Sequence, residues 1–371
     1  MELIERVDGV KGTSDGLAWP SRYVLLDGLR GLACMAVVLH HMGVVTIGHY
    51  AVMVFFVISG YCITASVQSG LKNGVSFGGF MMKRIRRIFP PYMLAVLFFA
   101  ATRLLKQHIS HSNLWHPSLQ QWVQNLTLTQ WVSLVFSPQT EASQNPVLFV
   151  ASFWSLNYEE QFYLVMGLSL LMAYRFNVAI IKPVIGLLVA GIIWNLRVPG
   201  GWVTGFFLEY WVHFALGSLL YFVMCVYPGR KNQLAFIAAM LLLVIYCLMQ
   251  IFPLRGADAL VEKRAFIELA LLSVVTIVLL LIRPLDQQIT SSRLWKPLAM
   301  VGTISYSLYL VHQFNLKLVS TITSIVVPAG FPEIMVIAAG LMLHIMIGAL
   351  FWRLCERPFQ SVNQKVVQDS V

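Results

Sequence analysis

Charged residues are scarce in this chain. Asp, Glu, Lys and Arg together make up 11% of its 371 residues, whereas 58% are hydrophobic. A soluble domain carries about a quarter charged residues, so this composition excludes an ordinary water-soluble protein. The mean hydropathy of +0.74 favours a chain that is surrounded by lipid, and we expect an integral membrane protein.

Several site signatures are missing as well. The five cysteines lie far apart without metal-ligand spacing, so we expect neither a metal site nor an obligatory disulfide. The chain has no Gly-rich phosphate loop and no Gly-x-Ser-x-Gly elbow, which disfavours a hydrolase. The net charge of +10 resides mostly between apolar runs. That pattern fits membrane orientation and lipid headgroups, and we expect no nucleic-acid partner.

Apolar runs of about spanning length recur along the whole chain, with no internal repeat. A spanning helix needs roughly 20 apolar residues, and this pattern predicts an all-α, polytopic membrane bundle of about ten transmembrane helices. The runs lie near residues 24–45, 50–67, 89–105, 152–174, 178–196, 204–226, 233–252, 265–282, 298–326 and 331–352.

The ends of the chain read as polar tails. The first 22 residues are polar and the first apolar run is long enough to stay in the membrane, so we expect no cleavable signal peptide. We predict a tail over 1–22, a transmembrane domain over 23–357 and a second tail over 358–371. Most Lys and Arg residues fall on the side that both termini share, which predicts cytoplasmic N- and C-termini.

Arg30 and His41 lie in the first apolar run, eleven positions apart. Eleven steps of about 100° bring both residues to nearly the same helix face, roughly 16 Å apart along the axis. Ionisable residues inside a span usually face a polar cavity. His41 could be a general base or a helix-packing histidine, and Arg30 could be a site residue or a topological anchor.

Glu159 and Glu160 begin the fourth predicted run, inside FWSLNYEEQFYLV (residues 153–165). Adjacent helix positions point about 100° apart, so at most one of these carboxylates would share a cavity with His41. That carboxylate could orient the imidazole or hold an acceptor hydroxyl. The alternative is an interfacial glutamate that pairs with a basic loop residue.

Two further clusters have both a functional and a plain reading. Lys83, Arg84, Arg86 and Arg87 form the densest positive cluster, placed in a connection over 68–88; they could grip phosphates or simply anchor the chain. In the ninth run, a spacing of three puts three polar side chains on one helix side, either to line an acceptor groove or to pack in the core. These residues are Tyr306, Tyr309 and His312.

Taken in order, these segments resemble acyltransferase family 3, the membrane O-acyltransferases, over roughly residues 23 to 360. Arg30, ten residues and His41 match its signature in the first span. The later matches are VFFVISGY (54–61), RIRRIFPPY (84–92), FWSLNYEEQFY (153–163), ISYSLYLVH (304–312) and ERPF (356–359). Met53 departs from the pattern, because an acidic residue is expected there.

The resemblance implies a cytoplasmic acyl-CoA donor and an acceptor hydroxyl, often on a cell-surface sugar. It makes His41 the catalytic residue and Arg30 its partner, and it puts Arg84 and Arg87 on the donor. Glu159 matches the acidic position of its motif. We add the neighbouring Lys83 and Arg86 to the donor site. The expected substrate-binding residues are Tyr306, Tyr309, His312, Trp154 and Glu160.

The resulting hypothesis is a membrane O-acetyltransferase of a bacterial inner membrane. It would use acetyl-CoA or another acyl-CoA, bind membrane lipid and modify a carbohydrate or glycolipid, with no metal. Whether His41 acts as base or as covalent acyl carrier stays open. The alternative is a transporter or flippase for a lipid-linked or anionic solute, with Arg30 and the basic cluster as binding groups.

The predicted orientation can be tested with reporter fusions. A reporter inserted within residues 70–80 and one at the C-terminus should both be active on the cytoplasmic side, because an even number of spans brings both ends to one side. Reporters that are active on opposite sides would refute the predicted number of crossings.

Overall fold

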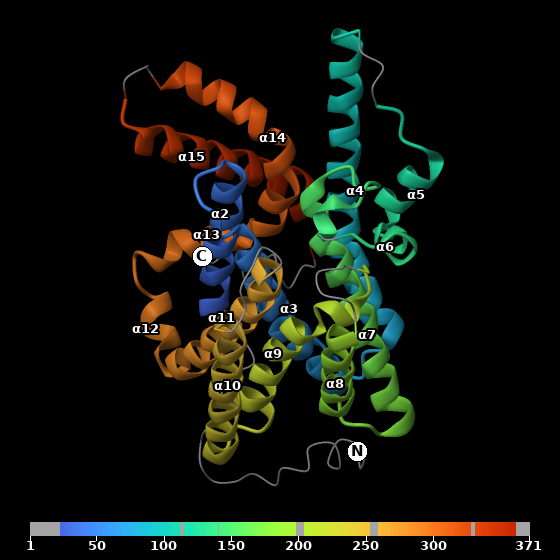
Figure 1. Cartoon of the computed structure of the whole chain (residues 1–371), viewed down its shortest axis with the longest axis vertical. Coiled ribbons are helices and arrows are strands. Elements are labelled where there is room, and N and C mark those ends of the chain that lie inside the picture. The colour runs from blue at the N-terminus through green and yellow to red at the C-terminus, as the bar shows by residue number, and fades with distance from the viewer. Residues whose placement is uncertain are drawn as a thin grey trace. The chain divides into compact units, whose positions relative to one another are not determined.

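The structure is a computed structural model that describes residues 23–111, 115–139, 141–197, 204–252, 259–327 and 331–360. Every element in these ranges is a helix (Figure 1), which confirms the all-α class, and each predicted apolar run contains one. The α-helices are α2 (Leu25–His41), α3 (Gly48–Lys72), α4 (Phe77–Ile109), α5 (Leu119–Thr127), α6 (Trp131–Phe136), α7 (Trp154–Phe176), α8 (Ile181–Arg197), α9 (Trp211–Tyr221), α10 (Arg230–Ile251), α11 (Ala259–Ile282), α12 (Asp286–Thr290), α13 (Trp295–Thr303), α14 (Ser305–Val326) and α15 (Glu333–Phe351).

Several of these helices have the length and composition of membrane spans. Within the described residues, 5 segments are long and apolar enough to cross: Gly48–Lys72, Phe77–Ile109, Arg230–Ile251, Lys263–Thr290 and Glu333–Phe359. Shorter apolar helices cover Ile181–Asn195 and Trp211–Val226. The structure thus supports a membrane helix bundle, while the count of ten crossings stays a prediction.

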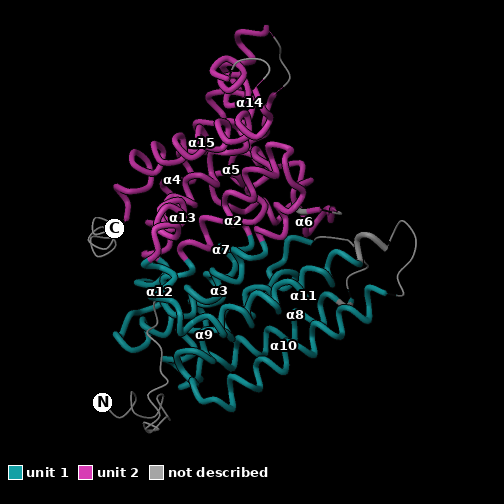
Figure 2. Tube along the Cα trace, turned by 90° about the vertical axis from the view of Figure 1, so that its left-hand side faces the viewer, with its two compact units in different colours: residues 1–26, 53–81, 158–291 teal, residues 27–52, 82–157, 292–371 magenta. Residues whose placement is uncertain are grey.

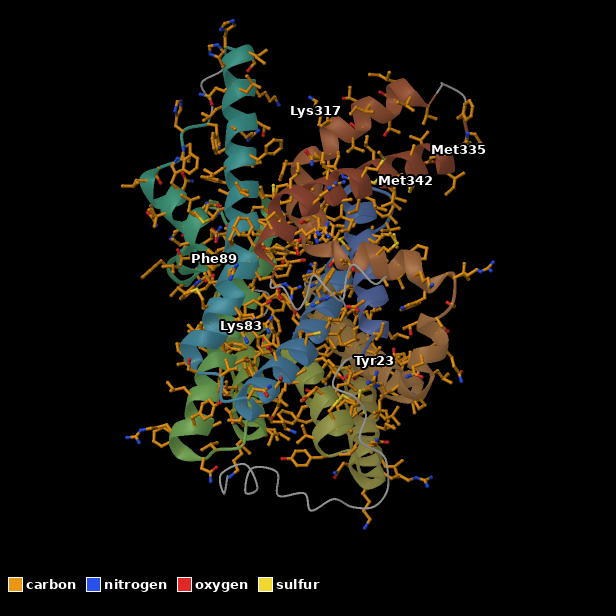
Figure 3. All side chains as sticks on the ribbon, turned by 180° about the vertical axis from the view of Figure 1, so that it is seen from behind. Tyr23, Lys83, Phe89, Lys317, Met335 and Met342 are labelled. Carbon is orange, nitrogen blue, oxygen red and sulfur yellow. The ribbon has the colours of Figure 1, made fainter. Side chains whose placement is uncertain are left out.

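The start of α4 differs from the prediction. The connection expected over 68–88 is short, because α3 runs to Lys72 and α4 already begins at Phe77. The basic cluster therefore lies on a helix; Figure 3 labels Lys83 and Phe89 along it. The reason is local composition, since long unbranched Met, Lys and Arg side chains favour helix over loop.

Two prolines, Pro90 and Pro91, stand inside α4. Each lacks an N–H, so the helix loses backbone hydrogen bonds there. Membrane helices tolerate this where neighbouring side chains take up freed backbone groups. The carbonyls left without their helical donor are those of Arg86 and Arg87, four residues earlier. Beside them, Tyr306 of α14 donates its hydroxyl to the Ile88 carbonyl at 2.9 Å and so joins α14 to this part of α4.

The chain divides into two compact units, coloured separately in Figure 2. Unit 1 contains residues 1–26, 53–81 and 158–291, and unit 2 contains residues 27–52, 82–157 and 292–371. Helices α2, α3, α4 and α7 have residues in both units.

In unit 1, α3 packs on α9 through aromatic rings and paired hydroxyls. Phe214 of α9 stacks on Phe56 and on Phe162 of α7, with ring centroids 4.5 and 4.3 Å away. Thr64 donates to the Ser218 hydroxyl at 2.8 Å, and both side chains are buried. Since lipid exerts no hydrophobic pressure between helices, such ring stacking and side-chain bonds hold membrane bundles together.

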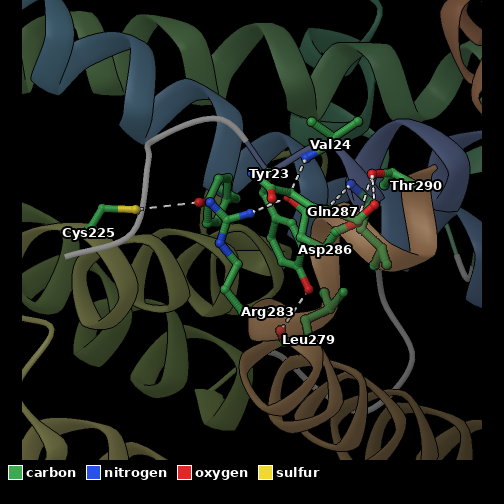
Figure 4. A network of polar contacts seen from close by, with 10 residues as sticks. Tyr23, Val24, Cys225, Leu279, Arg283, Asp286, Gln287 and Thr290 are labelled. Carbon is green, nitrogen blue, oxygen red and sulfur yellow. Dashed lines mark hydrogen bonds and ion pairs between the residues drawn. The ribbon is translucent and has the colours of Figure 1, made fainter. Parts of the chain in front are cut away.

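A buried polar network in unit 1 fixes the first turn of α2 (Figure 4). Asp286 accepts the Leu25 N–H at 2.8 Å and the Arg283 guanidinium at 2.6 Å, which caps the helix and pairs the charge. The Arg283 guanidinium also lies 4.4 Å from the Tyr23 ring centroid, and the Tyr23 hydroxyl donates to the Leu279 carbonyl at 2.8 Å. The helix that carries Arg30 and His41 therefore begins at a defined residue.

In unit 2, α2 crosses α13 closely and then runs along α14 in the same direction. The ninth predicted run is broken at Ile304 into these two helices. On α13, Gly28 lies against Trp295 and Gly31 against both Leu298 and Gly302. On α14 the contacts advance together with α2: Cys34 lies against Ser305 and His41 against His312.

This close approach depends on two glycines. A Cβ on Gly302 would lie 1.7 Å from the Asp27 carbonyl oxygen, and one on Gly31 would lie 2.1 Å from the Leu298 carbonyl oxygen. Both clashes are with backbone, which cannot rotate away. Small residues at a crossing let membrane helices come this near.

Gly302→Ala should therefore destabilise the protein by about 3 kcal/mol, the upper end for overpacking a filled site. The measurement is the apparent Tm of the protein in detergent. Gly186→Ala is the matched control, because a Cβ there meets nothing within 4 Å and α8 should lose no stability. Equal Tm values for the two variants would refute the proposed close packing of α2.

Candidate active site

His41 lies at the C-terminal end of α2 next to other imidazoles. Its ring centroid is 5.0 Å from that of His312, at an interplanar angle of 43°, and 5.2 Å from that of His40. His41 is half-buried, whereas His312 is completely buried. The structure thus brings together His41 and His312, two residues that the sequence assigned to separate roles.

His312 is held in one orientation by its own helix. Its Nδ1 lies 2.8 Å from the Tyr309 carbonyl oxygen. Because a carbonyl only accepts, Nδ1 must carry the hydrogen. In a neutral ring, Nε2 is then the acceptor nitrogen, and no side chain or backbone group among the described residues bonds to it.

Tyr309 ties α14 to the start of α7. Its hydroxyl donates to the Ser152 carbonyl at 2.7 Å and lies 2.7 Å from the Ser155 hydroxyl, which must then be the donor of that second bond. Gln313, one turn further along α14, accepts the Ser152 N–H at 2.7 Å. The predicted substrate residue Tyr309 is therefore rigidly placed beside His312.

Trp154, another predicted substrate residue, is the first residue of α7. Its ring stacks on His49 of α3, with centroids 5.9 Å apart and planes at 13°. Through Tyr309 and Ser155, Trp154 joins the region around His41 in unit 2. Flat, nearly buried rings of this kind offer an apolar face with a polar edge.

The other predicted residues of α2 and α14 lie along the same helices. Arg30 is half-buried on α2, about three turns before His41. Tyr306 uses its hydroxyl to bond the Ile88 carbonyl, so it joins α14 to α4.

The basic cluster on α4 has two faces. Lys83 and Arg86 are exposed, whereas Arg84 and Arg87 are half-buried and, three positions apart, share one side of the helix. The charge of Arg87 acts on the carboxylate of Glu356. Only one side of this cluster is therefore turned towards the protein.

Glu356 anchors the end of the chain to α14. It is buried and accepts the Ser307 hydroxyl at 2.6 Å and the Gln360 amide at 3.2 Å. The sequence showed Glu356 only as part of a motif. A carboxylate at the end of a long apolar run was the signal for this buried contact.

Glu159 and Glu160 belong to unit 1, not to the unit that holds His41. Glu159 accepts the Ser59 hydroxyl at 2.8 Å and also the Tyr163 hydroxyl. Glu160 is half-buried on the same helix. Their roles towards His41 or an acceptor stay predictions. Met53, where an acidic residue was expected, is fully buried in the core of unit 1.

His344 on α15 was missed by the sequence reasoning. It is buried, neither ring nitrogen has a hydrogen-bond partner among the described residues, and it acts electrostatically on His312. An ionisable residue amid apolar positions was the available signal. In the described part of the chain, no three His, Cys, Asp or Glu side chains form a group that could hold a metal; the absence of a metal stays an expectation.

Comparison with known proteins covers nearly the whole chain. The family described as an acyltransferase domain matches residues 23–353. The peptidoglycan O-acetyltransferase OatA of Listeria monocytogenes is 26% identical over 368 aligned residues, which cover 90% of this chain and 55% of OatA. The chain therefore spans about half the length of that relative.

Two other relatives share shorter stretches. YrhL of Bacillus subtilis, by its name a candidate peptidoglycan O-acetyltransferase, is 27% identical over 186 residues, covering 47% of this chain and 29% of YrhL. Protein 2 in the picA locus of Rhizobium radiobacter is 36% identical over 88 residues, covering 22% of this chain and 46% of that protein. No solved structure matches this chain.

Proposed function

Since this chain belongs to acyltransferase family 3, we propose that it is an O-acetyltransferase that moves an acetyl group from acetyl-CoA to a hydroxyl of a cell-surface glycan. The chain is an integral membrane protein, and we assign it to the inner membrane of a bacterium, with the transmembrane domain over 23–357 between two cytoplasmic tails. The name of OatA makes peptidoglycan the first acceptor to test.

The observation that carries this proposal is the half-buried imidazole of His41 beside His312. As a base, His41 takes the proton of the acceptor hydroxyl while the oxygen attacks the thioester carbonyl. The C–S bond then breaks, and the thiolate of coenzyme A takes that proton from His41. In the covalent variant, a His41 nitrogen attacks the thioester first and the hydroxyl then attacks the acyl-imidazole.

The geometry of α4 and α14 supports donor binding at the arginine cluster. Tyr306 bonds the Ile88 carbonyl, directly after Arg87, and His312 lies six residues further along α14. At 1.5 Å per residue, the level of the two imidazoles is roughly 9 Å along α14 from the arginines. The pantetheine arm of coenzyme A is longer than this, so phosphates at Arg84 and Arg87 leave its thioester within reach of His41.

The remaining site residues suit an acceptor sugar. The Tyr309 ring lies beside His312 and the Trp154 ring stacks on His49. Sugars commonly lay their apolar faces on such rings while polar edges bond their hydroxyls. We also assign three further residues to acceptor binding: Tyr306, His312 and Glu160. Arg30 would support His41 from the same helix, and Glu159 would orient the acceptor or the imidazole.

His41→Ala should lower acetyl transfer at least about 100-fold, the share of general acid–base catalysis. Membranes that contain the full chain are supplied with labelled acetyl-CoA, and label in glycan is counted at equal amounts of folded protein. The control is His40→Asn, whose amide can replace the bond from His40 Nδ1 to the Val45 carbonyl at 3.0 Å. Unchanged labelling in His41→Ala would refute its role, and solute movement without labelling would favour a transporter.

Replacing Arg84 and Arg87 by Gln should raise the KM for acetyl-CoA about tenfold or more, because each charge-assisted bond to phosphate contributes about 1.5–3 kcal/mol. The KM for the acceptor should stay the same. The matched control replaces Arg230 and Lys231, which lie at the start of α10 in unit 1. An unchanged KM for acetyl-CoA in the α4 variant contradicts donor binding there.

A further inference from the structure

His312 carries a buried nitrogen that the fold itself does not use. Its side chain is completely buried on α14, and Nδ1 is committed to the Tyr309 carbonyl. Nε2 has no hydrogen-bond partner among the described residues. A buried acceptor left without a donor is costly, and its persistence calls for a reason.

The His41 ring lies next to the His312 ring. The two centroids are 5.0 Å apart, a separation at which nitrogens on the facing edges of two imidazoles come within hydrogen-bond reach after a small ring rotation. The neutral His41 ring carries one N–H and one lone pair. Its N–H can therefore be donated to His312 Nε2, while its lone pair faces the substrate.

We infer that His312 is a positioning residue for the acetyl transfer: its Nε2 accepts the N–H of His41 and thereby sets the tautomer and orientation of the catalytic ring. The inference rests on the proposed function. It gives His312 a task different from acceptor binding. The chain of contacts runs from the Tyr309 carbonyl through His312 to His41, so the backbone of α14 orients the reacting imidazole.

A neutral acceptor suits this position. A buried carboxylate would bring a charge into an apolar span, at a large desolvation cost, whereas a neutral imidazole does not. When His41 receives the substrate proton, its bond to His312 becomes charge-assisted and strengthens. The contact is therefore stronger in the transition state than in the ground state, so its loss should lower kcat and leave KM nearly unchanged.

The decisive comparison is between His312→Asn and His312→Gln in the full chain, reconstituted in lipid. An Asn amide can replace the Nδ1–H that bonds the Tyr309 carbonyl, but it puts no acceptor near the Nε2 position. A Gln amide reaches the Nε2 position and can accept there. We expect kcat to fall about 10- to 100-fold in His312→Asn, the value of one hydrogen bond to a charged group, with both KM values within about twofold. His312→Gln should recover much of that loss.

His213→Asn is the control for losing a buried histidine as such, because His213 is buried in α9 of unit 1. It should leave kcat nearly unchanged. Wild-type kcat in His312→Asn overturns the inference, and so does an equal fall in the Asn and Gln variants. Absence of acetyl transfer in the wild-type protein would instead refute the proposed function.

Nitrogen-15 NMR of histidine-labelled wild-type protein tests the same point without any variant. We expect His312 to be protonated at Nδ1 and unprotonated at Nε2, and we expect His41 to donate its N–H to that Nε2. A proton on His312 Nε2 would overturn it, even where the variants do not fold.

Discussion

The close packing of α2 against α13 and α14 is the constraint on which the candidate site depends. His41 meets His312 only because Gly31 and Gly302 let the two backbones approach to the contact limit. Each turn of α2 then faces one turn of its neighbour. A helix crossing held by backbone contact has little freedom to slide, so the two imidazoles stay adjacent.

The apolar surroundings decide which groups can support His41. In water, a carboxylate would be the natural partner for a basic imidazole, but inside a span a charged group must be paired or solvated. Three carboxylates of this chain follow that rule: Asp286 pairs with Arg283, Glu356 takes bonds from Ser307 and Gln360, and Glu159 takes bonds from two hydroxyls. A neutral histidine such as His312 avoids that demand.

The positions of the helices could be predicted from the sequence, whereas the helices that pack against each other could not. Apolar runs reveal a helix because spanning length and composition are local properties, and each run does contain one. The partner of α2 could not be predicted, since the approach of Gly31 to Leu298 joins residues far apart in the chain. His41 was predicted as a site residue from its position in the first apolar run, whereas His344 belongs to no local motif.

The direction of α2 relative to α14 also bears on the topology. The two helices belong to the first and ninth predicted runs, and their contacts ascend in parallel. Two spans that run the same way are separated by an odd number of crossings. The predicted seven crossings between them satisfy this condition, and the loss of any single one would make the pair antiparallel. If α2 and α14 both cross, as the sequence predicts, then shorter helices such as α8 and α9 fail to cross only in pairs. A bundle in which two such helices do not cross has fewer spans, but α2 and α14 stay parallel. His41 and the start of α4 then keep their predicted sides of the membrane.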